Sequence, residues 1–473
     1  MTRLRNPAPG LARAALALAA AAALVAPAPA AAQGARRRPG LLFGGSDAPA
    51  PPPPAPVDPR LPRGAPLVLD ERPPSAEPAA CSALRPVCVH RGPGVPGEAA
   101  LRALAALERA HVSLFAALAL PLPEDDAGRG ATTGLDLYLD AGGDLEPHLG
   151  VDPPRTAEDR ASGFCRLGAA ATNAPALLDR AATLCLAGIA AAGLDAAETP
   201  HVRFAWAESL WLAVGRPTRL DLEAIDEVQA HPERAVLDRA AGPAALGSAL
   251  LFEWLDEARG AGGAGALGAA TLALSRGVTP PDAWEWHNEP DAADVLRASL
   301  GGGMRGMAEL LTGFAVARAF VGDRDTGAYL PGTAAFGTFG RVRIDWALPW
   351  STLPRRVAAK RPVEPTGSVY FWLPLDAPPS GKRLGFRAEW ERPWTFVWSV
   401  LRVGPGGEEL GRRDLVLQER ASSAEDVVTE LDGAAGVLFV GTNLGGVELA
   451  FPFDPDWAPF EPAGCTLYVT ALD

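Results

Sequence analysis

Residues 181–215 read AATLCLAGIAAAGLDAAETPHVRFAWAESLWLAVG and hold the strongest structural signal of the chain. Apolar residues recur three and four apart on both sides of a GLD turn, which predicts one helix over residues 175–192 and another over residues 200–214. Thr199 is the expected N-cap of the second helix, and Gly215 is expected to end it. The sequence therefore predicts a pair of adjacent, mostly apolar helices.

The region around this pair, residues 77–330, has a mainly helical pattern. Residues 100–120 repeat apolar positions at helical spacing. Residues 134–140, GLDLYLD, alternate Leu with Asp or Tyr and predict a strand with one buried face. The CRLG segment that follows, residues 165–168, is expected to be a turn. Further helices are expected over residues 222–230, 244–259, 290–298 and 304–320. The region is predicted to be α-rich with a small sheet.

The composition changes over residues 341–473, which contain seven of the twelve tryptophans. Short apolar runs such as GSVYFWLPL, TFVWSVLRV and GVLFVG follow one another, with Gly, Pro and Asp between them. Closely spaced short strands with turn residues between them predict an antiparallel β-sandwich. The boundary with the helical region is expected within residues 327–340, and the whole chain is predicted to be α+β.

The N-terminal residues predict export. Residues 1–32 combine a basic start, an apolar run too short to cross a bilayer, and small residues before a cleavage site, as secretory signal peptides do. Residues 33–76 are rich in Pro, Gly, Ala and Arg and are expected to form a disordered linker. No later stretch reaches about 18 apolar residues without a charge or a turn residue, so no membrane span is expected. The predicted location is periplasmic or extracellular.

Charge and cysteine content narrow the class of protein further. The net charge is −13, and it becomes −16 once the three arginines of the signal peptide are removed. Such a chain repels nucleic acid, so no nucleic-acid partner is expected. Export permits disulfides. Pairing of neighbouring cysteines gives Cys81–Cys88 and Cys165–Cys185 and leaves Cys465 free, although spacing alone does not fix connectivity.

The sequence lacks a complete catalytic motif. A zinc peptidase binds its metal with two histidines one helical turn apart and a further ligand from a second helix. Here the first predicted helix has LCLAG at residues 184–188, where Cys185 is the only soft ligand. The second helix offers one carboxylate, Glu208. Because one thiol and one carboxylate hold zinc poorly, no metal, other cofactor or enzymatic activity is expected.

The arrangement nevertheless resembles a known family. An N-terminal helix, the acidic loop PLPEDDAGRG, the strand GLDLYLD and a helix pair carrying AESLW follow in that order. This order resembles bacterial secreted metalloproteases of the gluzincin type, in a degenerate form that lacks HExxH. The resemblance implies that Glu208 corresponds to the family's ligand glutamate, while the two histidines and the general base have no counterpart. A C-terminal β-sandwich also fits members of this family.

Two interpretations of Glu208 remain open from the sequence. It is either a vestige of a metal site or a half-buried acid paired with Arg203 or Arg180.

Two other groups also have alternative interpretations. His287 with Glu285 and Glu289 resembles the acid-lined, aromatic cleft of a glycosidase, but the same segment also fits a loop and N-cap before the next helix. Trp390, Trp394 and Trp398 are either core residues or a surface on which sugars stack.

Three hypotheses follow from these patterns. The first is an exported pseudo-peptidase with a binding or structural β-sandwich. The second is an exported protein whose residues 341–473 bind a glycan or a protein partner. The third is a hydrolase that uses Glu285 and Glu289.

Overall fold

The computed structural model describes residues 70–74, 79–130, 133–154, 156–236, 248–260, 263–278, 288, 290–299, 304–375, 381–415, 421–446 and 461–472. Within the chain, Arg63–Asp473 form one compact unit. The predicted signal peptide, residues 1–32, lies outside the described residues, and so does the predicted linker, residues 33–76, except for residues 70–74.

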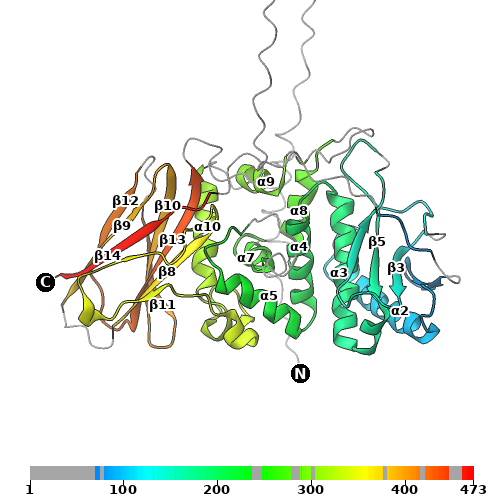
Figure 1. Cartoon of the computed structure of the whole chain (residues 1–473), viewed down its shortest axis with the longest axis horizontal. Helices are drawn as coiled ribbons and strands as arrows, with labels where there is room; N and C mark the ends of the chain where they lie inside the picture. The colour runs from blue at the N-terminus through cyan, green and yellow to red at the C-terminus, as the bar shows by residue number, and fades with distance from the viewer. Residues whose placement is uncertain are drawn as a thin grey trace, which may run out of the picture. The chain divides into compact units, whose positions relative to one another are not determined.

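The first sheet is mixed and five-stranded (Figure 1). Its strands lie in the order β1-β2-β3-β5-β4, with β2, β3 and β5 parallel and with antiparallel strands at both edges. The strands are β1 (Ala80–Cys81), β2 (Val87–Arg91), β3 (Leu135–Asp140), β4 (His148–Val151) and β5 (Gly163–Gly168). Helices α2 (Gly97–His111) and α3 (Pro175–Leu194) pack against it.

Strand β3 confirms the predicted strand but corrects its burial. Leu137 and Leu139 enter the core beneath the helices, as expected. Asp136 and Tyr138, on the opposite face, are also buried, at 1% and 4% exposure. The expectation of one buried face was wrong because Arg72 and side chains from neighbouring strands cover the polar face as well.

Strand β5 contains the CRLG segment, for which a turn was the wrong prediction. Cys165 pairs with Leu137 of β3 on one side and with Leu149 of β4 on the other. Backbone pairing with two neighbours holds the segment extended, and Gly168 ends the strand.

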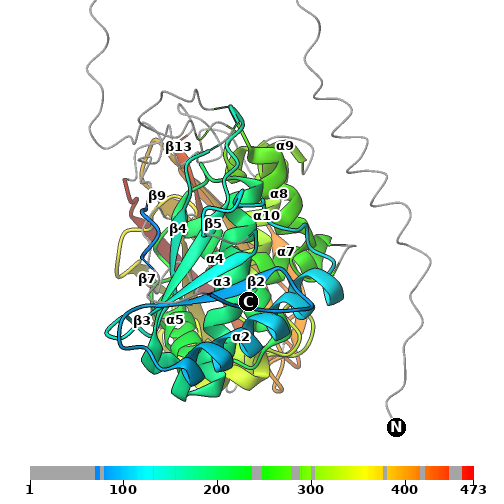
Figure 2. The same cartoon turned by 90° about the vertical axis from the view of Figure 1, so that its right-hand side faces the viewer.

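The predicted helix pair is confirmed. Helix α3 and helix α4 (Pro200–Val214) lie side by side (Figures 1 and 2). The Thr199 hydroxyl accepts a hydrogen bond from the Val202 amide, and Gly215 is the C-cap. Helix α3 is long and apolar enough to cross a membrane by length and composition, but 83% of its most apolar window is buried in the fold. It is the central helix of this core.

The other helices match three predicted ranges closely and add one helix. They are α5 (Arg219–Ala230), α7 (Ala249–Arg259), α8 (Ala266–Ser275), α9 (Ala292–Ser299) and α10 (Met304–Arg318). The first part of the predicted 244–259 helix lies outside the described residues. Helix α8 was not predicted, because its Ala-rich sequence has little contrast between its faces. A π-helical segment, Val112–Ala117, extends α2.

The C-terminal region forms two further sheets. One has the order β11-β10-β13-β8-β6 and the other the order β12-β9-β14-β7. Their strands are β6 (Trp346–Ala347), β7 (Arg355–Ala358), β8 (Ser368–Pro374), β9 (Arg383–Trp390), β10 (Trp394–Val403), β11 (Glu409–Asp414), β12 (Ser423–Val428), β13 (Gly436–Gly446) and β14 (Cys465–Leu472). Both sheets supply side chains to one core, where Phe386 of β9 meets Phe439 of β13 with ring centroids 5.2 Å apart.

Helix α10 joins the helical region to the first of these sheets. Ala315 and Val316 share a small core with Tyr370, Leu438 and Val440. The Tyr370 hydroxyl donates a 2.6 Å hydrogen bond to the Ala315 carbonyl. The predicted boundary region, residues 327–340, consists mainly of turns and short 3₁₀ segments. The described chain is therefore α+β.

Candidate functional site

The LCLAG segment belongs to α3 and packs with apolar contacts, in part against the edge strand β4. Leu184 is buried, and a Cβ added at Gly188 would lie 3.3 Å from a methyl carbon of Leu149 on β4. Between them, Cys185 is bonded to Cys165 of β5. The segment of α3 compared with a metal-binding motif is therefore occupied by packing contacts and a disulfide.

Glu208 lies in a buried ion-pair network centred on Arg180 of α3. Arg180 Nη2 donates to Glu208 Oε2 at 3.2 Å, and both side chains are 2% exposed. The same guanidinium donates through Nε to Asp221 of α5 and through Nη1 to Glu146 at 2.6 Å. Trp211 Nε1 donates to Asp221 Oδ2 at 2.8 Å. One arginine thus donates hydrogen bonds to carboxyl groups from two helices and one loop.

The two buried carboxyls of this network have opposite pKa shifts. Burial raises the pKa of Glu208 well above its ordinary value, and the charge of Arg180 only partly offsets this. Burial also opposes ionisation of Asp221, but a hydrogen bond with Glu208 and the charge of Arg180 outweigh it and lower the Asp221 pKa. The structure therefore favours a protonated Glu208 beside an ionised Asp221. Glu208 Oε1 has no hydrogen-bond partner.

This arrangement does not fit a zinc ion. Among the described residues, no three His, Cys, Asp or Glu side chains form a group that could hold a metal. Arg180 already occupies the space beside Glu208, and a guanidinium has no lone pair to donate. Arg203, the other partner considered from the sequence, instead lies in the field of Asp195 and Glu198.

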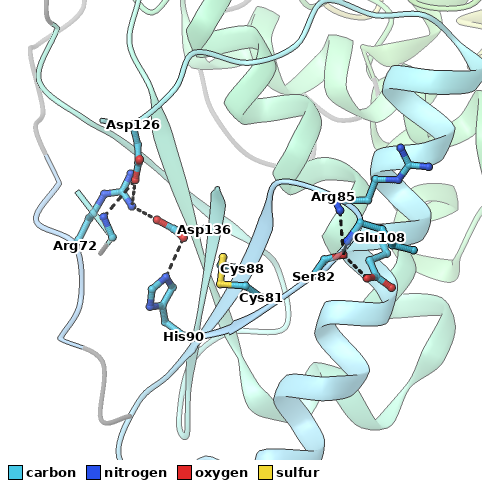
Figure 3. The surroundings of a disulfide bond; sticks show 11 residues. Arg72, Cys81, Ser82, Arg85, Cys88, His90, Glu108, Asp126 and Asp136 are labelled. Atoms are coloured by element: carbon cyan, nitrogen blue, oxygen red, sulfur yellow. Dashed lines mark hydrogen bonds and ion pairs between the residues drawn. A yellow bond between two sulfur atoms is a disulfide. The ribbon is translucent and has the colours of Figure 1, made fainter. Parts of the chain in front are cut away.

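A second buried arginine network lies on the opposite face of the first sheet and was missed from the sequence (Figure 3). Arg72 donates to both carboxylate oxygens of Asp152, at 3.0 and 2.7 Å. Its Nη1 contacts Asp136 and also Asp126, the latter at 3.0 Å. The guanidinium carbon lies 5.1 Å from the centre of the Phe164 ring. Carboxylates and an aromatic face thus surround one guanidinium.

Neighbouring polar groups complete this second network. His90 Nε2 lies 2.9 Å from the second oxygen of Asp136, and Ser162 donates to Asp152 at 2.8 Å. Burial opposes ionisation of Asp152, but hydrogen bonds from Arg72 and Ser162 outweigh it and lower its pKa. Burial raises the pKa of Asp126 despite two backbone amides that donate to it. The one sequence signal for this network is the Asp pattern of β3 and the loop before it.

The disulfides match the pairs expected from neighbouring cysteines. Cys81–Cys88 joins β1 to β2 (Figure 3), and Cys165–Cys185 joins β5 to α3. Cys465 is a buried thiol, and burial raises its pKa. Two disulfides are typical of proteins in an oxidising compartment.

The other sequence candidates are separated or lie outside the described residues. Glu285, His287 and Glu289 are outside them, although Asp291 caps α9 by accepting from the Asp294 amide. Trp390 and Trp398 line a cavity of about 270 Å³ between the edges of the two C-terminal sheets. Trp394 is buried in the core of that region.

Comparisons with known proteins give no family for this chain. No family model matches it, and no curated protein matches it. Among solved structures, it matches a crystal structure of the enzymatically active domain of tailspike protein 4 from bacteriophage CBA120, with 14% sequence identity and a TM-score of 0.16. The match covers 25% of this chain and 16% of that chain. At this TM-score the match carries no argument about fold or function.

Proposed function

We propose that this chain is an exported, non-catalytic protein of gluzincin-like descent, a pseudo-peptidase in which Arg180 supplies the positive charge next to Glu208. The observation that carries the proposal is the hydrogen bond from Arg180 Nη2 to Glu208 Oε2, which is 3.2 Å long and joins side chains that are 2% exposed. The pair joins the two helices on which the resembling peptidases hold their metal. The C-terminal region, residues 341–473, is then a β-sandwich that serves binding or folding.

The charges in the network support this proposal. Burying two carboxylates without compensation is costly, because each loses its hydration. A zinc ion would bring two positive charges, whereas Arg180 brings one. The raised pKa of Glu208 favours a bound proton, which makes up the difference. Arg180 and the two buried carboxyls can thus be neutral together without a metal, while the third partner, Glu146, is 45% exposed and keeps part of its hydration.

A protease assay on the purified mature chain tests the proposal. We expect no cleavage of casein that depends on added zinc or responds to a chelator. The matched variant is Glu208→Gln, which keeps the shape of the side chain and removes its acidity. Chelator-sensitive proteolysis that Glu208→Gln abolishes would overturn the proposal.

A second candidate function is binding of a glycan or protein partner through residues 341–473. The cavity lined by Trp390 and Trp398 favours it, since aromatic side chains beside polar groups are typical of ligand sites. A glycan array and a pull-down with the full mature chain test this candidate. Absence of any bound glycan or protein in both experiments would count against it.

A further inference from the structure

The site around Arg72 matches the shape and the donor groups of one guanidinium (Figure 3). Nε and Nη2 donate to the two carboxylate oxygens of Asp152, at 3.0 and 2.7 Å, in the side-on geometry that arginine forms with a carboxylate. Nη1 contacts Asp136 and also, at 3.0 Å, Asp126. The guanidinium carbon lies over the Phe164 ring, 5.1 Å from its centre, which is within the range of a cation–π contact. Each guanidinium nitrogen and one face of the group therefore have a partner.

Groups other than Arg72 also hold the three carboxylates of this site in place. These groups are the Gly128 and Gly130 amides for Asp126, at 2.9 and 3.2 Å, the His90 ring for Asp136, at 2.9 Å, and the Ser162 hydroxyl for Asp152, at 2.8 Å. Because these contacts do not involve Arg72, they are kept when its guanidinium leaves. A site whose groups are oriented in advance loses little free energy in ordering them when a ligand binds. The carboxylates thus form a site that does not depend on its present occupant.

The segment of residues 70–74, which carries Arg72, has few other contacts. Two of its residues are exposed, and no backbone hydrogen bond joins it to another part of the described chain. Asp70 lies 3.7 Å from the His148 ring, and the His148 side chain is 63% exposed. Among the contacts of the described residues, the Arg72 side chain is therefore the main anchor of the segment. Its withdrawal breaks no pairing between the strands of the sheet.

We propose that this face of the first sheet carries an arginine-binding site, which Arg72 fills in the chain alone and which an arginine side chain of another polypeptide fills in its place. The exchange conserves charge and hydrogen bonds, because one guanidinium replaces another. The net charge of −13 attracts a basic partner segment. A lysine side chain is a poor substitute, because its ammonium group lacks the planar pair of donors that Asp152 accepts. The inference concerns binding alone and is independent of both proposed functions.

A ¹³C NMR titration of N-acetyl-arginine amide, labelled at Cζ, with the full mature chain tests this inference. In Arg72→Ala the site is vacant, so we expect a saturable shift of the Cζ signal at millimolar ligand. The wild type should bind the same ligand about tenfold more weakly, because its own Arg72 competes at a high effective concentration. Adding Asp152→Asn to Arg72→Ala should weaken binding about tenfold, because the side-on pair is lost.

Matched variants keep the test decisive. Arg109→Ala removes an arginine from an exposed ion pair elsewhere, so it should bind the ligand no better than the wild type. If Arg72→Ala does not fold, Arg72→Lys keeps a cation at the same position and should still bind the ligand more tightly than the wild type. N-acetyl-lysine amide should not displace the labelled ligand. The proposal is overturned if either variant, folded by near-UV circular dichroism, gives no saturable shift, or if Asp152→Asn leaves binding unchanged.

Discussion

Arg180 and Arg72 are two buried arginines that solve the same electrostatic problem on opposite faces of one sheet. Each contacts three carboxylates, and in each set one carboxyl has a lowered pKa and another a raised one. The arginines differ in how the backbone holds them. Arg180 is part of the central helix α3, whereas Arg72 belongs to the short described segment 70–74.

We expect the two arginines to differ in how much stability is lost on their removal, although their contacts are similar. Removing Arg180 leaves carboxyls that helices hold inside the core, with little room for water. Removing Arg72 leaves carboxyls that the segment covers from outside, so water can reach them if the segment moves. The cost of losing each arginine should therefore differ.

The largest expected effect comes from Arg180→Met. It leaves Glu208 and Asp221 buried without their cation, which typically costs about 3–5 kcal/mol. Urea unfolding followed by circular dichroism measures the change in the free energy of unfolding. If this variant does not fold, Arg180→Met combined with Glu208→Met and Asp221→Leu should recover folding, because apolar residues of similar size then replace the buried members of the charged group, and Glu146 is 45% exposed. A loss below 1 kcal/mol for Arg180→Met would contradict the account.

Arg72→Ala should cost less, about 2 kcal/mol, because charged hydrogen bonds are lost at a site that water can enter. Millimolar methylguanidinium should restore part of the lost stability in a thermal shift assay, since the three aspartates and Phe164 remain in place. Arg72→Lys should not behave like the wild type, because an ammonium group cannot pair side-on with Asp152. Equal losses for Arg72→Ala and Arg180→Met would remove the distinction between the two networks.

The opposite pKa shifts within the Arg180 network give a third test. Glu208→Gln should match the wild type in stability at acid pH, where the acid is protonated in both the folded and the unfolded chain. It should exceed the wild type at neutral pH, because the wild type must then bind a proton in order to fold. Asp221→Asn should instead lower stability at neutral pH, because Arg180 then loses an ionised partner.

The pH dependence of Glu208→Gln follows from the same shift. A carboxyl with a raised pKa in the folded state holds its proton over a pH range in which the unfolded chain has released it. The contribution of Glu208 to the free energy of unfolding therefore decreases as the pH rises from the ordinary glutamate pKa of about 4.3 towards the pKa of Glu208 in the folded state. This decrease should be absent in Glu208→Gln. An unchanged pH profile would mean that Glu208 is ionised in the wild type.

The smallest expected effect is that of Arg109→Met, which sets the baseline. Arg109 pairs with Asp179 at 2.5 Å, but the two side chains are 59% and 39% exposed. Exposed ion pairs contribute about 0.2–1 kcal/mol and weaken with salt. Urea unfolding in low and high salt should show little difference between this variant and the wild type. A loss comparable to that of Arg180→Met would show that exposure does not separate these ion pairs.

The sequence predicted the helix pair well because its signals are local. Thr199 and Pro200 start α4, and Gly215 ends it, so each boundary depends on the residue that occupies it. The pairing of Glu208 was left open between Arg180 and Arg203, because the sequence does not show how the predicted helices pack. Only the three-dimensional packing decides in favour of Arg180.

The Arg72 network could not be predicted in the same way. The alternation in GLDLYLD correctly indicates a strand, but it does not say whether the polar face meets water or another part of the chain. Arg72 lies 64 residues before Asp136 in the sequence and in a region whose composition predicts a linker. Contacts across such a separation leave no periodic pattern.

We propose that Arg180, and not a metal ion, occupies the space beside Glu208. Elemental analysis of the mature chain, purified without chelators and then equilibrated with zinc and desalted, tests it most directly. The account predicts far less than one zinc ion per chain. One zinc ion per chain that Glu208→Gln abolishes would contradict it.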